Sequence, residues 1–312
     1  MTTEARPGAL LMTYGSPDSL EREDVGAYLA RVRGGREPDP ELVDEFTRRY
    51  RVIGGSPLIE ITQRLAAALS IELGWPVQVG MRFSEPSIES GLRALANLGA
   101  TVVAGIILSP QYSPMLMGGY ERAIDAARTA IGPGAPNVRI ADAWHREPRF
   151  IEAMSDRLVR ELDARSAEDR AATRVLMTAH SLPKRVAVAE PAYLQQLSDT
   201  AEAIATSAEL PSDSWVFCWP SAGHEPGEWM KPDFADLMPE IEASGGRHVV
   251  VAPVQFLADH LETLYDVDVG AREQAELHGL TFARIASLND DSGLTGALSA
   301  VARRTVRAST AS

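Results

Sequence analysis

Short apolar runs rich in β-branched residues alternate with longer stretches of helical periodicity along most of the chain. Such runs are typical of parallel strands buried on both faces, joined by crossover helices. Strands are expected at residues 10–14, 77–83, 102–108, 138–141, 175–179, 215–219, 248–253 and 281–285. Helices are expected at residues 23–32, 41–51, 58–73, 88–98, 120–131, 149–162, 193–208, 261–276 and 294–308.

The two halves of this pattern resemble each other. Residues 11–17 resemble 176–183 at the end of a first strand, and residues 102–113 resemble 249–260. We therefore expect an α/β fold of two similar Rossmann-like lobes, each a four-stranded parallel sheet flanked by helices. The first spans 7–144, completed by a C-terminal helix at 290–308, and the second spans 145–288. Ligands of open α/β sheets bind beyond the carboxyl ends of the strands, so a cleft between the lobes is the expected site.

Composition narrows the class of protein. The 312 residues carry a formal net charge of −13, which disfavours nucleic acid or an anionic membrane surface as the main partner. The longest apolar runs are far shorter than the roughly 20 residues that span a bilayer, and the N-terminus lacks a signal-peptide pattern. The single cysteine, Cys218, excludes an internal disulfide, a CxxC zinc site and an iron-sulfur cluster. These features predict a cytoplasmic protein without a transmembrane anchor.

His180 is the first candidate for chemistry. It follows an apolar strand and precedes Ser181, Leu182 and Pro183, so it is expected at the carboxyl edge of the sheet. A neutral imidazole there could bind a metal or accept a proton. Position alone gives equal weight to a hydrogen-bonded structural histidine.

Residues 259–268 form the second candidate, an acidic segment after the strand at 248–253. If a helix begins here, Glu262 and Asp266 lie at i and i+4 on one face, where they could pass a divalent cation inward. Alternatively, Asp259 and Glu262 form a capping-box-like pair at the helix start. No GxGxxG, P-loop, HExxH or nucleophile-elbow motif is present, so nucleotide cofactors and zinc hydrolysis are disfavoured.

Several segments together resemble one family. Residues 179–183 (Ala-His-Ser-Leu-Pro) closely resemble the ferrochelatase signature around its active-site histidine, and residues 259–266 resemble that family's acidic helix. Residues 12–17, 33–38, 49–58, 219–221 and 229–233 also match, in the family order. The resemblance covers essentially the whole chain. It is strongest to the Gram-positive and actinobacterial branch, whose substrate is coproporphyrin III.

The resemblance implies insertion of Fe²⁺ into a porphyrin held between two Rossmann-like lobes. His180 and Glu262 would be the catalytic and metal-handling pair, with Asp266 and Asp268 as secondary acids. The positions that match porphyrin-contacting residues are Tyr14, Arg33, Arg49, Tyr50, Ser56 and Tyr120, with Tyr14 facing the metal axially. Fe²⁺ would be a substrate, with no prosthetic group. The resemblance further implies transient contact with other enzymes of the haem pathway.

The chain departs from the family pattern at Gly270, where another acid is common, and at Gly34, where a second arginine is common. Alternatives are a protoporphyrin IX ferrochelatase, a nickel or cobalt chelatase of another tetrapyrrole route, and a non-catalytic haem- or porphyrin-binding protein. Nickel and cobalt chelatases tend to use more histidines, for which His224 and His260 are the candidates here. The sequence leaves open the metal preference, the oligomeric state and whether His180 or Glu262 takes the pyrrole proton.

Overall fold

The computed structural model describes residues 5–220 and 227–310, with side chains described to residue 308. His224, named above as a candidate histidine, lies outside the described residues. The chain divides into two compact units. Unit 1 holds residues 1–109, 114–144 and 289–312, and unit 2 holds residues 110–113 and 145–288.

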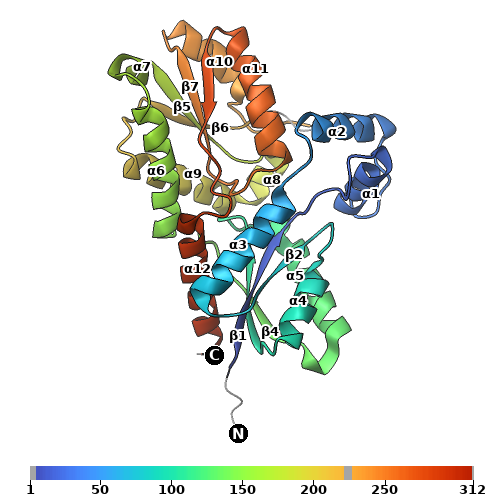
Figure 1. Cartoon of the computed structure of the whole chain (residues 1–312). Helices are drawn as coiled ribbons and strands as arrows, with labels where there is room; N and C mark the ends of the chain where they lie inside the picture. Colours follow the sequence, from blue (N-terminus) through green and yellow to red (C-terminus); the bar gives the residue numbers. More distant parts are fainter. Residues whose placement is uncertain (1–4, 221–226, 311–312) are drawn as a thin grey trace. The chain divides into compact units, whose positions relative to one another are not determined.

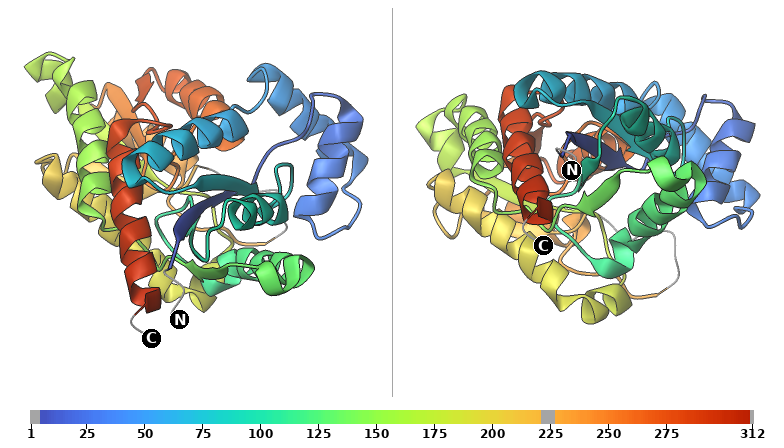
Figure 2. Two further views of the ribbon diagram at one scale, coloured as in Figure 1. Left: turned by 60° about the horizontal axis from the view of Figure 1, so that its bottom comes forward. Right: turned by 90° about the horizontal axis from the view of Figure 1, so that it is seen from below.

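Unit 1 is built on a four-stranded parallel sheet with the order β2-β1-β3-β4 (Figure 1). Its strands are β1 (Pro7–Thr13), β2 (Val77–Met81), β3 (Val102–Ile107) and β4 (Asn137–Ile140). Its helices are α1 (Arg22–Val32), α2 (Pro40–Val52), α3 (Leu58–Leu73), α4 (Ile88–Asn97), α5 (Pro114–Ile131), the 3-10 turn η1 (Gly132–Gly134) and α12 (Ser292–Thr310). Helix α12 packs along α3 and against β3. Figure 2 shows α12, in red, beside the light-blue ribbon of α3. The C-terminal helix therefore covers the first sheet.

Unit 2 repeats this arrangement with the order β6-β5-β7-β8, again all parallel. Its strands are β5 (Thr173–Thr178), β6 (Trp215–Cys218), β7 (His248–Pro253) and β8 (Thr281–Arg284). Its helices are α6 (Pro148–Asp163), α7 (Ala167–Ala171), α8 (Lys184–Ala189), α9 (Pro191–Ser207), α10 (Phe234–Ala243), the π-helix η2 (Glu262–Ala271) and α11 (Arg272–Leu277). The predicted fold class, two four-stranded parallel sheets flanked by helices, is confirmed.

A short segment after β3 belongs with unit 2, although it falls within the range expected for the first lobe. The side chain of Gln111 donates a hydrogen bond to Thr200 Oγ1 at 2.9 Å. The amide of Tyr112 donates to Gln196 Oε1 at 2.8 Å. These bonds tie residues 110–113 to α9.

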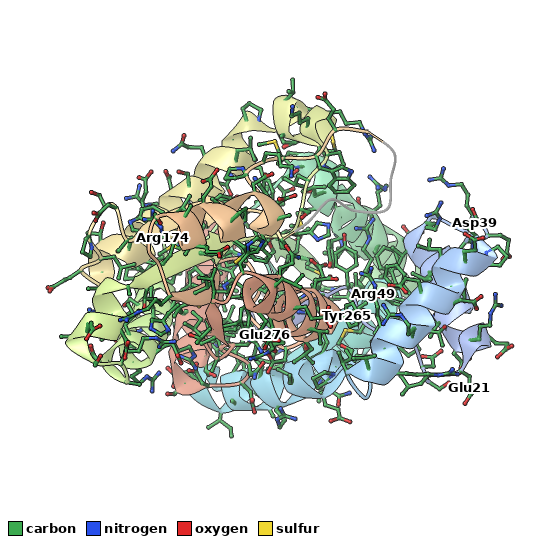
Figure 3. All side chains as sticks on the ribbon, turned by 90° about the horizontal axis from the view of Figure 1, so that it is seen from above. Glu21, Asp39, Arg49, Arg174, Tyr265 and Glu276 are labelled. Atoms are coloured by element: carbon green, nitrogen blue, oxygen red, sulfur yellow. The ribbon has the colours of Figure 1, made fainter. Side chains whose placement is uncertain are left out.

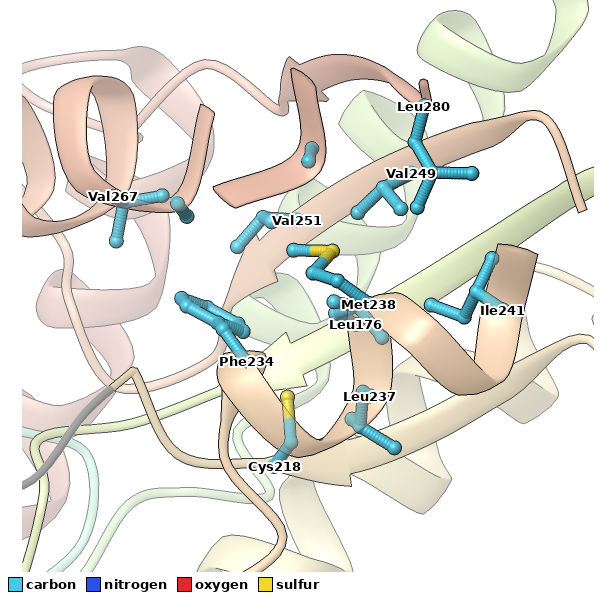
Figure 4. Close-up of a cluster of buried hydrophobic side chains, with 12 residues drawn as sticks. Leu176, Cys218, Phe234, Leu237, Met238, Ile241, Val249, Val251, Val267 and Leu280 are labelled. Carbon is cyan, nitrogen blue, oxygen red and sulfur yellow. The ribbon is translucent and has the colours of Figure 1, made fainter. Parts of the chain in front are cut away.

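The core of unit 2 shows why its strands read as continuous apolar runs. One face of the sheet packs against α10, where Phe234 and Met238 lie against Val249 and Val251 of β7 (Figure 4). Cys218 is fully buried in this cluster, and burial raises the pKa of its thiol. The lone cysteine is thus an apolar core residue.

Three short helices in unit 2, α7, α8 and α10, were not expected from periodicity. Helix α10 begins at a full capping box, in which the Asp233 side chain accepts from the Asp236 amide and Asp236 accepts from the Asp233 amide. Pro239 lies inside this helix and interrupts the helical sequence pattern that would otherwise predict it. In unit 1, α5 starts at Pro114 rather than at residue 120, since Pro114 suits the first helical turn despite Gly118 and Gly119 behind it.

The strand ladders define equivalent positions in the two units. The Leu108 amide donates to Met12 O at 2.8 Å, and the Val254 amide donates to Thr178 O at 2.8 Å. Each bond continues the ladder between a central strand and the next, from β1 to β3 and from β5 to β7. Met12 and Thr178 are therefore equivalent, and Tyr14 and His180, two residues later, occupy the same place after each first strand.

Candidate active site

His180 lies two residues beyond β5, where the chain leaves the sheet. Its backbone amide donates to the side-chain Oε1 of Gln255 at 2.9 Å. Its imidazole remains 55% exposed. The main chain is therefore held while the ring stays accessible to a ligand.

The imidazole is paired with a carboxylate from a distant part of the chain. Nδ1 of His180 lies 2.7 Å from Oε2 of Glu262, at the start of η2. The charge of Glu262 raises the pKa of His180, although the partial loss of water around the ring opposes this shift. Burial raises the pKa of Glu262, but attraction to His180 and the hydrogen bond outweigh it and lower that pKa overall. The two motifs singled out in the sequence thus meet in one pair.

The predicted helix after residue 260 is mostly a π-helix, η2, followed by α11. π-helical hydrogen bonds link i to i+5, and such segments occur frequently at functional sites. The Glu262 carboxylate contacts the His180 imidazole. The alternative expected from the sequence, in which Glu262 and Asp259 form a capping-box-like pair, is therefore not the arrangement found. Thr263 has a capping role instead, since its hydroxyl accepts from the His260 amide at 2.9 Å.

The two secondary acids on η2 have different surroundings. The charge of Asp266 helps to raise the pKa of His180. Asp268 instead accepts two hydrogen bonds from the guanidinium of Arg284 on β8, at 2.7 and 2.8 Å. Arg284 also donates to Asp259 at 3.1 Å. Asp268 therefore joins η2 to the sheet.

His260 is mostly enclosed by its own segment. Its Nδ1 lies 2.9 Å from the carbonyl of Ala258, and its ring meets Phe256 edge-on with centroids 4.8 Å apart. Burial lowers the pKa of His260. Since Nδ1 faces a carbonyl, this ring is held as the Nδ1–H tautomer.

Tyr14, the unit 1 counterpart of His180, stands on a group of aromatic rings. The residue is 45% exposed, and its ring lies 5.3 Å from that of Phe83 and 6.3 Å, edge-on, from the buried ring of Tyr120. The guanidinium of Arg82 lies over all three rings, 4.7 to 5.9 Å from their centroids. Sequence reasoning missed Arg82. The only available signal was its place just after β2, at the same sheet edge as Tyr14.

The other predicted porphyrin-contacting residues lie on helices and turns of unit 1. Arg33 is exposed at the end of α1. Arg49, labelled in Figure 3, is largely buried on α2 and paired with Glu45 at 2.7 Å, while Tyr50 beside it is only 4% exposed. Ser56 accepts from the Leu58 amide at 3.4 Å, at the start of α3.

A permanent metal centre has no counterpart among the described side chains. Within residues 5–220 and 227–310, no three His, Cys, Asp or Glu side chains gather in a way that could hold a metal ion. Among the same residues, no helix has the length and apolar character needed to cross a membrane.

Comparison with known proteins identifies the family. The ferrochelatase family model matches residues 6–306. The chain belongs to the ferrochelatase family. A ferrochelatase from Herpetosiphon aurantiacus is 34% identical over 294 residues, covering 92% of this chain and 95% of that protein. A coproporphyrin III ferrochelatase from Geobacillus thermodenitrificans is 33% identical over 303 residues, covering 94% of each. This ferrochelatase is thus an enzyme that inserts iron into a porphyrin.

Two solved structures share this fold over nearly the whole chain. SirB from Bacillus subtilis with Fe³⁺ matches with a TM-score of 0.57 at 12% identity, covering 98% of each chain. CbiX, described as the terminal enzyme for biosynthesis of siroheme in denitrifying bacteria, matches with a TM-score of 0.51 at 13% identity, covering 96% of this chain and 98% of that one. At such low identity these matches establish the fold of this ferrochelatase and nothing about its substrate.

Proposed function

We propose that this ferrochelatase inserts Fe²⁺ into coproporphyrin III, with His180 and Glu262 as its catalytic, metal-handling pair. The observation that carries the proposal is the 2.7 Å contact between the His180 imidazole and the Glu262 carboxylate at the edge of the second sheet. The choice of porphyrin is supported by relatives at 31 to 34% identity that are named coproporphyrin III ferrochelatases.

The chemistry needs a group that accepts protons and a group that attracts a cation. A porphyrin loses two pyrrole protons as its nitrogens take up the metal, and a neutral imidazole is a suitable acceptor near neutral pH. The charge of Glu262 raises the proton affinity of His180. Glu262 stays ionised beside it, so its carboxylate is a ligand for Fe²⁺ as the ion sheds water.

Asp266 extends this negative charge along η2, and we propose that it attracts Fe²⁺ toward Glu262. Its charge already acts on His180. We give Asp268 no role in metal transfer, because both its oxygens accept hydrogen bonds from Arg284.

In unit 1, we propose that Tyr14 faces the porphyrin through its exposed ring, backed by the buried ring of Tyr120. Arg33 and Arg49 would bind propionates, because a guanidinium can bind a carboxylate with two parallel hydrogen bonds. Arg49 already contacts Glu45, so a propionate would have to share or replace that partner. Tyr50, the next residue on α2, and Ser56, just before α3, complete the set of residues that we propose to contact the porphyrin.

The test is anaerobic Fe²⁺ insertion by the purified protein, followed by porphyrin absorbance with coproporphyrin III and protoporphyrin IX in parallel. A higher kcat/KM with coproporphyrin III supports the proposal, and a higher value with protoporphyrin IX overturns the substrate assignment. His180→Ala should abolish insertion while porphyrin binding, measured by fluorescence quenching, is largely kept. Full turnover by His180→Ala would overturn the role of the pair.

A further inference from the structure

Both the oxygen and the nitrogen of the Gln255 side-chain amide form hydrogen bonds within unit 2. It lies two residues beyond β7 and is 8% exposed. Its Oε1 accepts from the His180 amide at 2.9 Å, and its Nε2 donates to the hydroxyl of Tyr193 on α9. Tyr193 is itself only 2% exposed. The amide therefore has one orientation that satisfies both partners, and the buried hydroxyl of Tyr193 fixes it to α9.

The bond to His180 replaces a missing link of the sheet. The last main-chain bond of the β5–β7 ladder runs from the Val254 amide to Thr178 O. In a regular parallel ladder, the next bond would run from the His180 amide to the carbonyl of residue 254. Here the Oε1 of Gln255 accepts from that amide instead. The side chain thus extends the ladder by one bond, to the residue that carries the reactive ring.

The main chain of Gln255 leads to the other member of the pair. Residues 256–261 connect it to η2, where Glu262 meets the imidazole. One residue therefore holds His180 through its side chain and begins the segment that carries Glu262. Small displacements matter here, because moving a reacting group by about 1 Å can cost on the order of a hundredfold in rate.

We propose that Gln255, oriented by Tyr193, is a positioning residue that holds His180 in register with Glu262 for metal insertion. The proposal rests on the roles of His180 and Glu262 proposed above. Gln255 acts through the backbone of His180 and contacts neither substrate in this role. Its loss should therefore reduce kcat while the affinity for the porphyrin changes little.

The experiment compares Gln255→Leu, Gln255→Glu and Tyr193→Phe in anaerobic Fe²⁺ insertion with coproporphyrin III, together with thermal melting. Gln255→Leu keeps a similar side-chain volume but removes both hydrogen bonds, and we expect kcat to fall roughly ten- to a hundredfold with KM for porphyrin within twofold. Gln255→Glu keeps an acceptor for the His180 amide and can accept from the Tyr193 hydroxyl, so it should restore part of kcat. Tyr193→Phe should lower kcat by a smaller factor than Gln255→Leu.

Gln196→Leu is the matched control within the same unit. The Gln196 amide bonds to the backbone of Tyr112 at 2.8 and 3.2 Å, so this change also removes two side-chain hydrogen bonds. It should lower the melting temperature about as much as Gln255→Leu does, with kcat within twofold of wild type. An equal fall of kcat in both leucine variants would overturn the proposal, because general loosening would then explain it.

The outcomes also separate this inference from the proposed function. If His180→Ala keeps full turnover, the role of the pair fails, whatever Gln255 does. If His180→Ala is inactive while Gln255→Leu stays within twofold of wild type, only the positioning role is overturned. If Gln255→Leu fails to fold, Tyr193→Phe provides the test. An unchanged kcat in that variant would overturn the positioning role of Gln255.

Discussion

The contrast between Asp266 and Asp268 leads to a prediction with a magnitude. Arg284 is 11% exposed at its side chain and Asp268 is 26% exposed, so their bidentate pair is partly shielded from water. Breaking a fully buried pair costs about 3–5 kcal/mol, but here Asp259 remains to balance the guanidinium. Asp268→Asn should then cost about 2 kcal/mol, in the range of a hydrogen bond to a charged group. For a domain of this size the melting temperature should fall by roughly 4–8 °C.

Asp266→Asn is the matched variant on the same helix, and it should behave in the opposite way. Its melting temperature should stay close to wild type, because the pair with Arg284 is intact. Loss of about 1 kcal/mol of attraction for the metal would raise KM for Fe²⁺ roughly fivefold. The assay is scanning calorimetry of both variants, with anaerobic insertion kinetics well below either melting temperature.

The reasoning is refuted by the reverse result. Suppose that the melting temperature of Asp268→Asn lies within about 1 °C of wild type while most of its turnover is lost. Asp268 would then handle the metal. Asp266 would then lose the role proposed for it if its variant kept a normal KM for Fe²⁺.

Three further predictions concern other parts of the molecule. Phe234→Ala, in the core of unit 2, should cost about 3–5 kcal/mol and lower the melting temperature accordingly, whereas a shift below that of Asp268→Asn would show that the core relaxes around the cavity. A methyl group at position 119 would overlap the guanidinium of Arg82, which lies over the ring of Tyr14. Gly119→Ala should therefore displace Arg82 and weaken porphyrin binding, measured by fluorescence. Unchanged binding would show that Arg82 can move freely. Hydrogen bonds from Arg48, together with Arg49, lower the pKa of Glu45 to about 2, so its stabilising contribution is present above its usual pKa of 4.5 and is lost as pH falls toward 2. Glu45→Gln should therefore melt below wild type at pH 6, with a difference that shrinks below pH 4.5; a difference constant with pH would contradict this assignment.

Much of the fold was predictable because the inner strands of both sheets, β1, β3, β5 and β7, are buried on both faces. The run at 248–253 coincides with β7, since every residue from Val249 to Pro253 is buried. Helix α10 was not predictable from periodicity, because Pro239 interrupts the pattern and its start depends on a capping box. The π-helix could not be predicted either, since over ten residues its apolar spacing differs little from that of an α-helix.

The site was predictable only where its residues lie in local motifs. The sequence indicated His180 and Glu262 separately, and the structure brings them to 2.7 Å. The partner of Asp268 could not be predicted, because Arg284 comes from the next strand along the chain. No sequence pattern indicated Gln255, because its proposed role depends on where the main-chain hydrogen bonds between β5 and β7 end.

The equivalence of Tyr14 and His180 has an evolutionary consequence. A duplicated half-protein begins with the same side chain at both copies of this position, and the sheets beneath do not depend on which side chain it is. Mutation at these two places alone could therefore give one half a phenol oxygen and the other an imidazole nitrogen. Chelatases for different metals and tetrapyrroles could diverge by such exchanges without any change of fold.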